Sequence, residues 1–301
     1  MKIVAHCFAD NSSITPSPLN IDFKGFNVRL FPVDQNLTLQ VSKILSDEEL
    51  LNFSKRIVHD TENIKAIEDQ LEGKLRPYKI ILTEVAQLFE GLLALMYNSV
   101  PPHFDTSKTF VNLYAETETE REMIENGSIT RGAGYVIMPD RKSYNIDNSL
   151  LDLIAPSINH LPAFSFYSQA LKSLNNNDNE IAFFLFFRII DGYFSYGAKD
   201  VRKELLKKEN ELKYYIPYET KLINSLTTIL TEMGLPTESK NDYKGLIGDI
   251  VNVRHKLTHF SSTKATAHHT ASIKLELSTV NSYLYQCCFN LLRDKISPVD
   301  I

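Results

Sequence analysis

The chain has 301 residues, of which 43% are hydrophobic and 23% charged, a composition typical of a folded protein with room for two domains. The net charge of −5 argues against indiscriminate nucleic-acid binding. No apolar run approaches the roughly 20 residues that span a bilayer. The N-terminus lacks a secretory signal pattern, and three cysteines do not make a disulfide framework. We therefore expect a cytoplasmic protein with reduced thiols and no membrane contact.

Residues 1–150 predict a mixed α+β domain. Short β-branched or alternating segments predict strands at 2–9, 26–33, 37–45, 109–115 and 134–139. Ser46 and Glu49 have the spacing of a capping box, which predicts that a helix begins there. Helical periodicity continues to about Gln70, is interrupted over 73–77, and resumes over 78–97. No chemical motif marks this half, and we expect it to have a sensing or regulatory role.

Residues 155–301 predict an all-α antiparallel helical bundle. The expected helices span 162–174, 180–214, 218–234, a segment that begins after a cap at Asn241 or Asp242, and 271–295. The first half of the helix at 180–214 is apolar nearly all round, which predicts a central position in the bundle. The overall fold class is therefore α+β, with the strands confined to the first half.

One short stretch of the second half, "NVRHKLTHF" at 252–260, combines an arginine, a lysine and two histidines. From Lys240 to Lys274 there are six basic residues and two acidic ones, although the whole chain is acidic. Such a local excess of positive charge is compatible with a phosphate site. Chance fluctuation in charge explains it equally well.

The helix that carries this stretch has a core stripe and a polar flank. The stripe consists of residues spaced at three and four: Leu246, Ile250, Val253, Leu257 and Phe260. Arg254 lies beside the stripe, whereas His255 and His259 lie on the far side. On an unbroken helix Arg254 and His259 are about 140° apart. They can converge on one phosphate if the helix ends near Thr258 or the arginine side chain reaches round.

The order of arginine, polar residue and histidine resembles the signature of the HEPN superfamily of helical-bundle domains. That family carries an Arg-x4–6-His motif on a late helix of a four- or five-helix bundle, which corresponds here to Arg254 and His259, with His255 as the polar follower. The arrangement looks closest to the Apea-like group associated with abortive infection. The resemblance covers roughly residues 155–301 and does not extend to the first half.

The resemblance implies a metal-independent endoribonuclease that needs no cofactor, acting as a toxin or antiviral-defence effector. RNA supplies its own nucleophile, the ribose 2′-hydroxyl, so the products would carry 2′,3′-cyclic phosphate and 5′-hydroxyl ends. His259 suits proton transfer, because imidazole titrates near neutral pH. Arg254 suits stabilisation of the phosphorane, and His255 has a supporting role. The implied partners are RNA and a second copy of the chain, because the family forms composite sites in dimers.

Other interpretations stay open. The bundle could be a non-catalytic module that binds nucleotide, RNA or a protein, with an ordinary polar helix face. His255 and His259 also have the spacing of a zinc pair, with His268 and His269 as further ligands, although Lys256 disfavours a dication. Asp191, a carboxylate within an apolar helix, could orient the motif or lie at a solvated edge. Tyr193 and Tyr196 could stack on a base or belong to the core.

Overall fold

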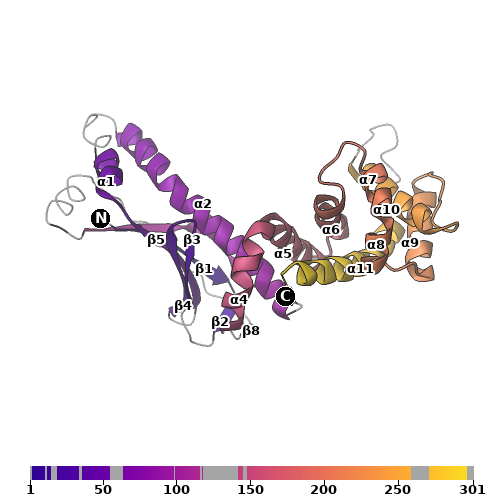
Figure 1. Ribbon diagram of the computed structural model, residues 1–301, viewed down its shortest axis with the longest axis horizontal. Coiled ribbons are helices and arrows are strands. Elements are labelled where there is room, and N and C mark those ends of the chain that lie inside the picture. The colour runs from indigo at the N-terminus through magenta and orange to yellow at the C-terminus, as the bar shows by residue number, and fades with distance from the viewer. Residues whose placement is uncertain are drawn as a thin grey trace. The chain divides into compact units, whose positions relative to one another are not determined.

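The computed structural model describes two compact units. Its described residues are 2–10, 12–14, 19–33, 36–54, 64–97, 99–115, 117, 142–144, 148–258 and 271–296. The first unit comprises Met1–Glu90 with Pro102–Ala155, and the second comprises Gly91–Pro101 with Pro156–Ile301. The strands belong to the first unit and helices α5 to α11 to the second (Figure 1). The fold is therefore α+β, with a C-terminal helical region.

An antiparallel sheet of six strands forms the centre of the first unit. Its path is β3-β4-β5-β1-β6, and β7 also pairs with β1. The strands span β1 Lys2–Asp10, β3 Leu19–Phe23, β4 Phe26–Val33, β5 Asn36–Ile44, β6 His103–Phe104 and β7 Phe110–Tyr114. A separate parallel pair joins β2 Ser12–Ile14 to β8 Lys142–Tyr144. The strand predictions near 2–9, 26–33, 37–45 and 109–115 are confirmed, whereas 134–139 lies outside the described residues.

Strand β3, which forms a hairpin with β4, was not predicted from the sequence. Phe23 pairs with Phe26 across a two-residue turn. Both turn residues have positive φ, 52° at Lys24 and 78° at Gly25. This turn geometry matches the right-handed twist of the flanking strands, and it is unusual for lysine. The strand was missed because Lys-Gly is a weak hairpin signal.

The predicted capping box is present at the start of helix α1, Asp47–Ser54. The Glu49 amide donates to Ser46 Oγ at 3.3 Å, and the Ser46 amide donates to the Glu49 carboxylate at 3.0 Å. The amide of Ser46 and that of Glu49 are thereby satisfied reciprocally. Lys43 also approaches Glu49, and its side-chain hydrogen bond is the largest cause of a lowered Glu49 pKa.

The predicted interruption over 73–77 is wrong, because helix α2 runs unbroken from Ile64 to Tyr97 with Pro77 inside it. A proline within a helix costs about 3 kcal/mol. Leu82, Val85 and Phe89 are each 0% exposed, and burying a side chain of this size contributes about 1.5–3 kcal/mol. The apolar face that follows therefore outweighs the proline.

Gly73–Tyr97 is the one candidate span among the described residues that is long and apolar enough to cross a membrane, and 67% of its most apolar window is buried, as in the core helix of a soluble protein.

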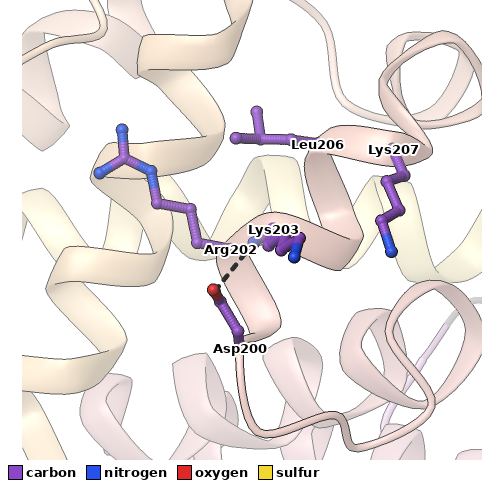
Figure 2. Close-up of a pocket in the computed structure, with 5 residues that line it drawn as sticks. All are labelled: Asp200, Arg202, Lys203, Leu206 and Lys207. Atoms are coloured by element: carbon purple, nitrogen blue, oxygen red, sulfur yellow. Dashed lines mark hydrogen bonds between the residues drawn. The ribbon is translucent and has the colours of Figure 1, made fainter.

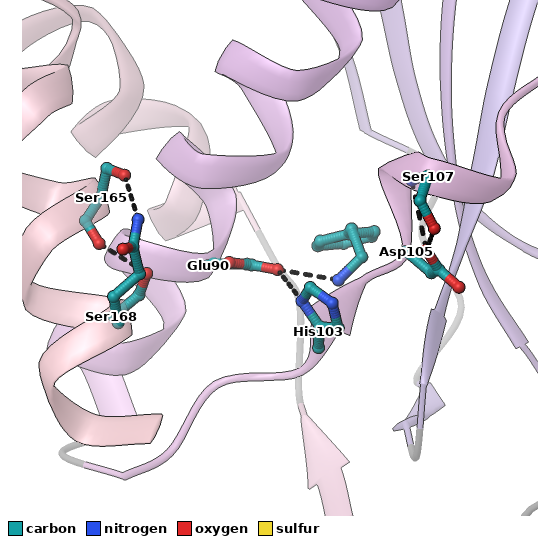
Figure 3. Close-up of polar contacts among 8 residues, drawn as sticks. Glu90, His103, Asp105, Ser107, Ser165 and Ser168 are labelled. Atoms are coloured by element: carbon teal, nitrogen blue, oxygen red, sulfur yellow. Dashed lines mark hydrogen bonds and ion pairs between the residues drawn. The ribbon is translucent and has the colours of Figure 1, made fainter. Parts of the chain in front are cut away.

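Polar contacts also hold α2 within the first unit. The buried Glu90 Oε1 accepts the Phe104 amide at 2.8 Å and lies 3.0 Å from His103 Nδ1 (Figure 3). A buried carboxylate is costly unless it is paired, and these two groups compensate it. The same figure shows Ser107 bonded to the Asp105 carboxylate at the turn that follows β6. Glu90 therefore fixes β6 against the helix.

The second unit consists of helices packed around apolar side chains. After α4 Asn148–Ser157 and a short 3-10 turn, the helices are α5 Leu161–Asn175, α6 Asn179–Phe194, α7 Val201–Lys207, α8 Glu209–Tyr215, α9 Thr220–Glu232, α10 Tyr243–Thr258 and α11 Ala271–Ile296. Helix α6 lies in the core as predicted, with Phe183, Phe186 and Phe187 at most 1% exposed. At the end of α2, a Cβ on Gly91 would lie 2.4 Å from Phe164 Cβ of α5, so only glycine permits this packing.

Helices α6 and α11 run parallel, which departs from the expected antiparallel arrangement. The Asn281 amide donates to the Asn179 carbonyl at 2.8 Å, and the Cys288 thiol lies 3.5 Å from the Phe186 carbonyl. Both pairs are separated by 102 residues. A constant offset along two helices requires that they point the same way. The long connection through α7 to α10 makes this parallel pairing possible.

The single helix predicted over 180–214 is wrong, because it is three helices. α6 ends at Phe194, and Tyr196 and Gly197 then adopt positive φ of 53° and 69°. The left-handed conformation ends a helix and is easiest for glycine. The Asp200 side chain then caps α7 by accepting the Lys203 amide at 3.1 Å. Tyr196 is 80% exposed and is not part of the core.

Candidate functional site

Helix α10, which carries Arg254 and His255, is fixed firmly at its N-terminal half. The Asp242 carboxylate accepts the Gly245 amide at 2.7 Å and caps the helix, as the sequence indicated. Asp249 is 0% exposed, and its carboxylate accepts the amides of Glu238 at 3.1 Å and Ser239 at 2.8 Å. The loop before the helix is thereby tied to the helix itself.

Two glycines allow close approaches to this half of α10. A Cβ on Gly245 would lie 2.1 Å from the Glu238 carbonyl oxygen, which is backbone and cannot move aside. A Cβ on Gly248 would lie 2.8 Å from Arg202 Nη2 of α7. Arg202 in turn forms an ion pair with Glu238. The segment "GLIGD" at 245–249 is therefore a packing motif, which the sequence analysis did not identify.

The C-terminal half of α10 holds Arg254 against α6. Leu246, Ile250 and Val253 are buried as predicted, but Leu257 is only partly buried, and Phe260 lies outside the described residues. The Arg254 guanidinium carbon lies 5.8 Å from the centre of the Phe187 ring. No ion pair joins Arg254 to a carboxylate of the described residues. A cation placed in this way keeps donors available for an anionic ligand.

The two motif histidines differ in what the structure describes. His255 is exposed on α10. The Thr258 hydroxyl donates to the carbonyls of Arg254 at 3.1 Å and His255 at 2.9 Å, and Thr258 is the last described residue of α10. His259 lies outside the described residues, so its convergence with Arg254 stays a prediction.

Asp191, the supporting residue expected on α6, has a local partner. It is 6% exposed, which excludes a solvated edge, and its carboxylate accepts the Ser195 hydroxyl. No ion pair between Asp191 and Arg254 is present. Ser195 lies four residues further along the chain, so this hydrogen bond stabilises the end of α6. Any action of Asp191 on the motif stays a prediction.

An open concavity of about 410 Å³ lies beside helix α7 (Figure 2). It is lined by Asp200, Arg202, Lys203, Leu206 and Lys207. Lys207 pairs with Glu204 at 2.7 Å, and Arg202 with Glu238, whereas Lys203 is exposed and forms no ion pair with a described residue. No functional residue was predicted in this segment from the sequence. The sequence does contain a pattern that indicates it: three cations, at 202, 203 and 207, lie on one short helix.

The described residues bear on two further possibilities, a nucleophilic cysteine and a zinc site. Cys7, Cys287 and Cys288 are buried, and burial raises the pKa of both Cys7 and Cys288, so these two thiols are not poised as nucleophiles. Among the described residues no group of three or more His, Cys, Asp or Glu side chains is arranged to hold a metal ion. His259, His268 and His269 lie outside them, so the zinc alternative stays open.

The fold and site together define an α+β protein with an antiparallel sheet in one unit and a helical second unit carrying an arginine–histidine motif. No protein-family model, curated protein sequence or solved structure matches this chain. The HEPN resemblance therefore depends on the motif spacing, because the described residues of the second unit form helices α5 to α11, more than the five expected.

Proposed function

We propose that the chain is a metal-independent endoribonuclease whose second unit acts as a HEPN-like domain. The observation that carries the proposal is Arg254, a partly buried guanidinium that rests on Phe187 and forms no ion pair with a described carboxylate. A partly buried cation without a carboxylate partner is suited to bind an anion. It lies four residues before Thr258, the last described residue of α10, and His259 follows directly in the sequence.

The proposed reaction divides between these two side chains. His259 removes the proton from a ribose 2′-hydroxyl, the 2′-oxygen attacks the phosphorus, and the bond to the 5′-oxygen breaks. The leaving oxygen takes a proton, which His259 of a second copy can supply. Arg254 stabilises the negative charge that builds on the phosphorane oxygens. No metal or cofactor enters this scheme, and His255 orients the substrate or the facing motif.

In this proposal the protein is a cytoplasmic effector of antiviral defence by abortive infection, or a toxin. It acts as a homodimer or higher oligomer that brings two motifs together, and the first unit receives a regulatory or trigger signal. A non-catalytic RNA- or nucleotide-binding module is the second candidate. The concavity beside α7, lined by Arg202, Lys203 and Lys207, favours it, because cations there could hold phosphates without chemistry.

The test is cleavage of total RNA in EDTA. The wild-type protein should cleave it and leave 2′,3′-cyclic phosphate ends, whereas Arg254→Ala and His259→Ala should not. Lys244→Ala is the matched control, because Lys244 is an exposed cation on the same helix. RNA binding without cleavage by the wild type would support the non-catalytic module. A strict monomer at micromolar concentration in light scattering would contradict the composite site.

A further inference from the structure

A second cavity, of about 230 Å³, lies between the start of α5 and the second half of α6. Its α6 wall includes Ile189 and Tyr193. These residues are roughly 200° and 240° round the helix from Phe187, against which Arg254 rests. The cavity therefore faces away from the arginine–histidine motif, and an inference about it does not depend on the proposed ribonuclease.

A neutral polar pair lies in this cavity. The Tyr193 hydroxyl is 2.9 Å from His160 Nδ1, and the two rings are 5.6 Å apart. Burial raises the pKa of Tyr193, so the hydroxyl keeps its proton. Burial, and then the charge of Lys295, lower the pKa of His160. At neutral pH both groups are uncharged and present hydrogen-bonding atoms without a full charge, which suits the edge of a heteroaromatic base.

The remaining walls separate an apolar interior from a charged rim. Phe166, which is partly buried, supplies aromatic surface, and the exposed Asn159 supplies an amide with both donor and acceptor atoms. Arg188 is exposed and forms no ion pair with a described carboxylate. A planar guanidinium at a rim matches the oxygens of a phosphate. The inner part of the cavity therefore suits an aromatic ring, and its mouth at Arg188 suits an anionic group.

We propose that this cavity binds a nucleoside monophosphate, with the base inside and the phosphate at Arg188. Its volume is below the roughly 300 Å³ at which sites for drug-sized ligands begin. It therefore accommodates one flat ring and leaves the rest of the ligand at the mouth. The aromatic wall stacks on the base, and the His160–Tyr193 pair and Asn159 contact its edge.

Gly192 offers a way to block the cavity without damage to the fold. It lines the cavity, it is exposed, and a Cβ built on it would meet no atom within 4 Å. Glycine within a helix costs about 1 kcal/mol relative to alanine, so Gly192→Ala and Gly192→Leu should keep or raise the melting temperature. Gly192→Leu adds a bulky side chain to the wall of the cavity and should thereby reduce the space left for a ligand.

The experiment is isothermal titration calorimetry of the full chain with AMP, GMP, CMP and UMP, and separately with adenosine and inorganic phosphate. At least one monophosphate should bind more tightly than both partial ligands. Arg188→Ala should weaken it about 10- to 100-fold, the usual worth of a hydrogen bond to a charged group. Gly192→Leu should abolish binding while the protein stays folded by circular dichroism. Lys221→Ala, which changes an exposed cation on α9, should leave binding unchanged.

Four outcomes would overturn the proposal. The first is that no monophosphate binds the folded wild type at millimolar concentration. The second is that inorganic phosphate binds as tightly as the nucleotides, because the ring would then contribute nothing. The third is that binding survives Gly192→Leu. The fourth is that Arg254→Ala abolishes binding, which would assign the nucleotide to the motif on α10 and not to this cavity.

Discussion

Replacing Arg254 by alanine should separate catalysis from stability. The Arg254 side chain makes a cation–π contact with the Phe187 ring at 5.8 Å and forms no ion pair with a described carboxylate. A cation–π contact of this kind contributes about 0.5–1 kcal/mol. The free energy of unfolding should therefore fall by only about 1 kcal/mol. Loss of a group that stabilises transition-state charge typically lowers the rate about 100- to 1,000-fold.

The matched comparison is Leu246→Ala on the same helix. Leu246 is 0% exposed, so its truncation should cost about 2–5 kcal/mol through a cavity and reduce cleavage only through the unfolded fraction. Leu257 is a weaker control than the sequence suggested, because it is only partly buried. Urea denaturation gives the stabilities, and cleavage of a labelled RNA in EDTA gives the rates. Arg254→Lys should recover little activity, since an ammonium lacks the planar fork. If Arg254→Ala destabilised as much as Leu246→Ala and kept full cleavage, the arginine would be structural.

Three further predictions concern the hydrogen bonds between Asp249 and the loop before α10, the cavity between α5 and α6, and the zinc alternative. Asp249→Ala should lower the free energy of unfolding by about 2–5 kcal/mol, because two loop amides lose their acceptor; a loss below about 1 kcal/mol in urea denaturation would contradict the clamp. His160, whose folded pKa is lowered by burial and by Lys295, binds fewer protons in the folded than in the unfolded state. Its contribution to stability should therefore be lost as pH falls below 6.5. His160→Gln should make the melting temperature depend less on pH in this range. An unchanged dependence would show that protonation of His160 does not cause it. Metal analysis of the purified protein should find no stoichiometric zinc, whereas one zinc per chain would favour the pair His255 and His259.

The features that the sequence predicted correctly depend on neighbours in the chain. The capping box at Ser46 and Glu49 needs two residues three positions apart, and the strand and helix periods are equally local. The errors arise where tertiary packing decides. Pro77 stays inside α2 because the helix face that follows it is buried. The break after Phe194 needed Tyr196 to adopt a positive φ, which no propensity assigns to tyrosine.

Helix α10 likewise contains both kinds of feature, one visible in the local sequence and one that depends on tertiary packing. The charged half of α10 was singled out because Arg254 and His259 have the spacing of the motif that the sequence resembles, and its role stays a prediction. The anchored half was not, because Asp249 and Gly245 act on backbone atoms of the preceding loop, and Gly248 acts on an arginine 46 residues earlier. Yet the anchor is what a functional arginine requires, since a group that stabilises a transition state must be held within a fraction of an ångström. A helix fixed in its N-terminal half by a buried carboxylate and by two close approaches, one to backbone and one to the Arg202 side chain, should leave Arg254 in its C-terminal half little freedom to shift. Weakening the anchor should therefore reduce cleavage even in molecules that remain folded.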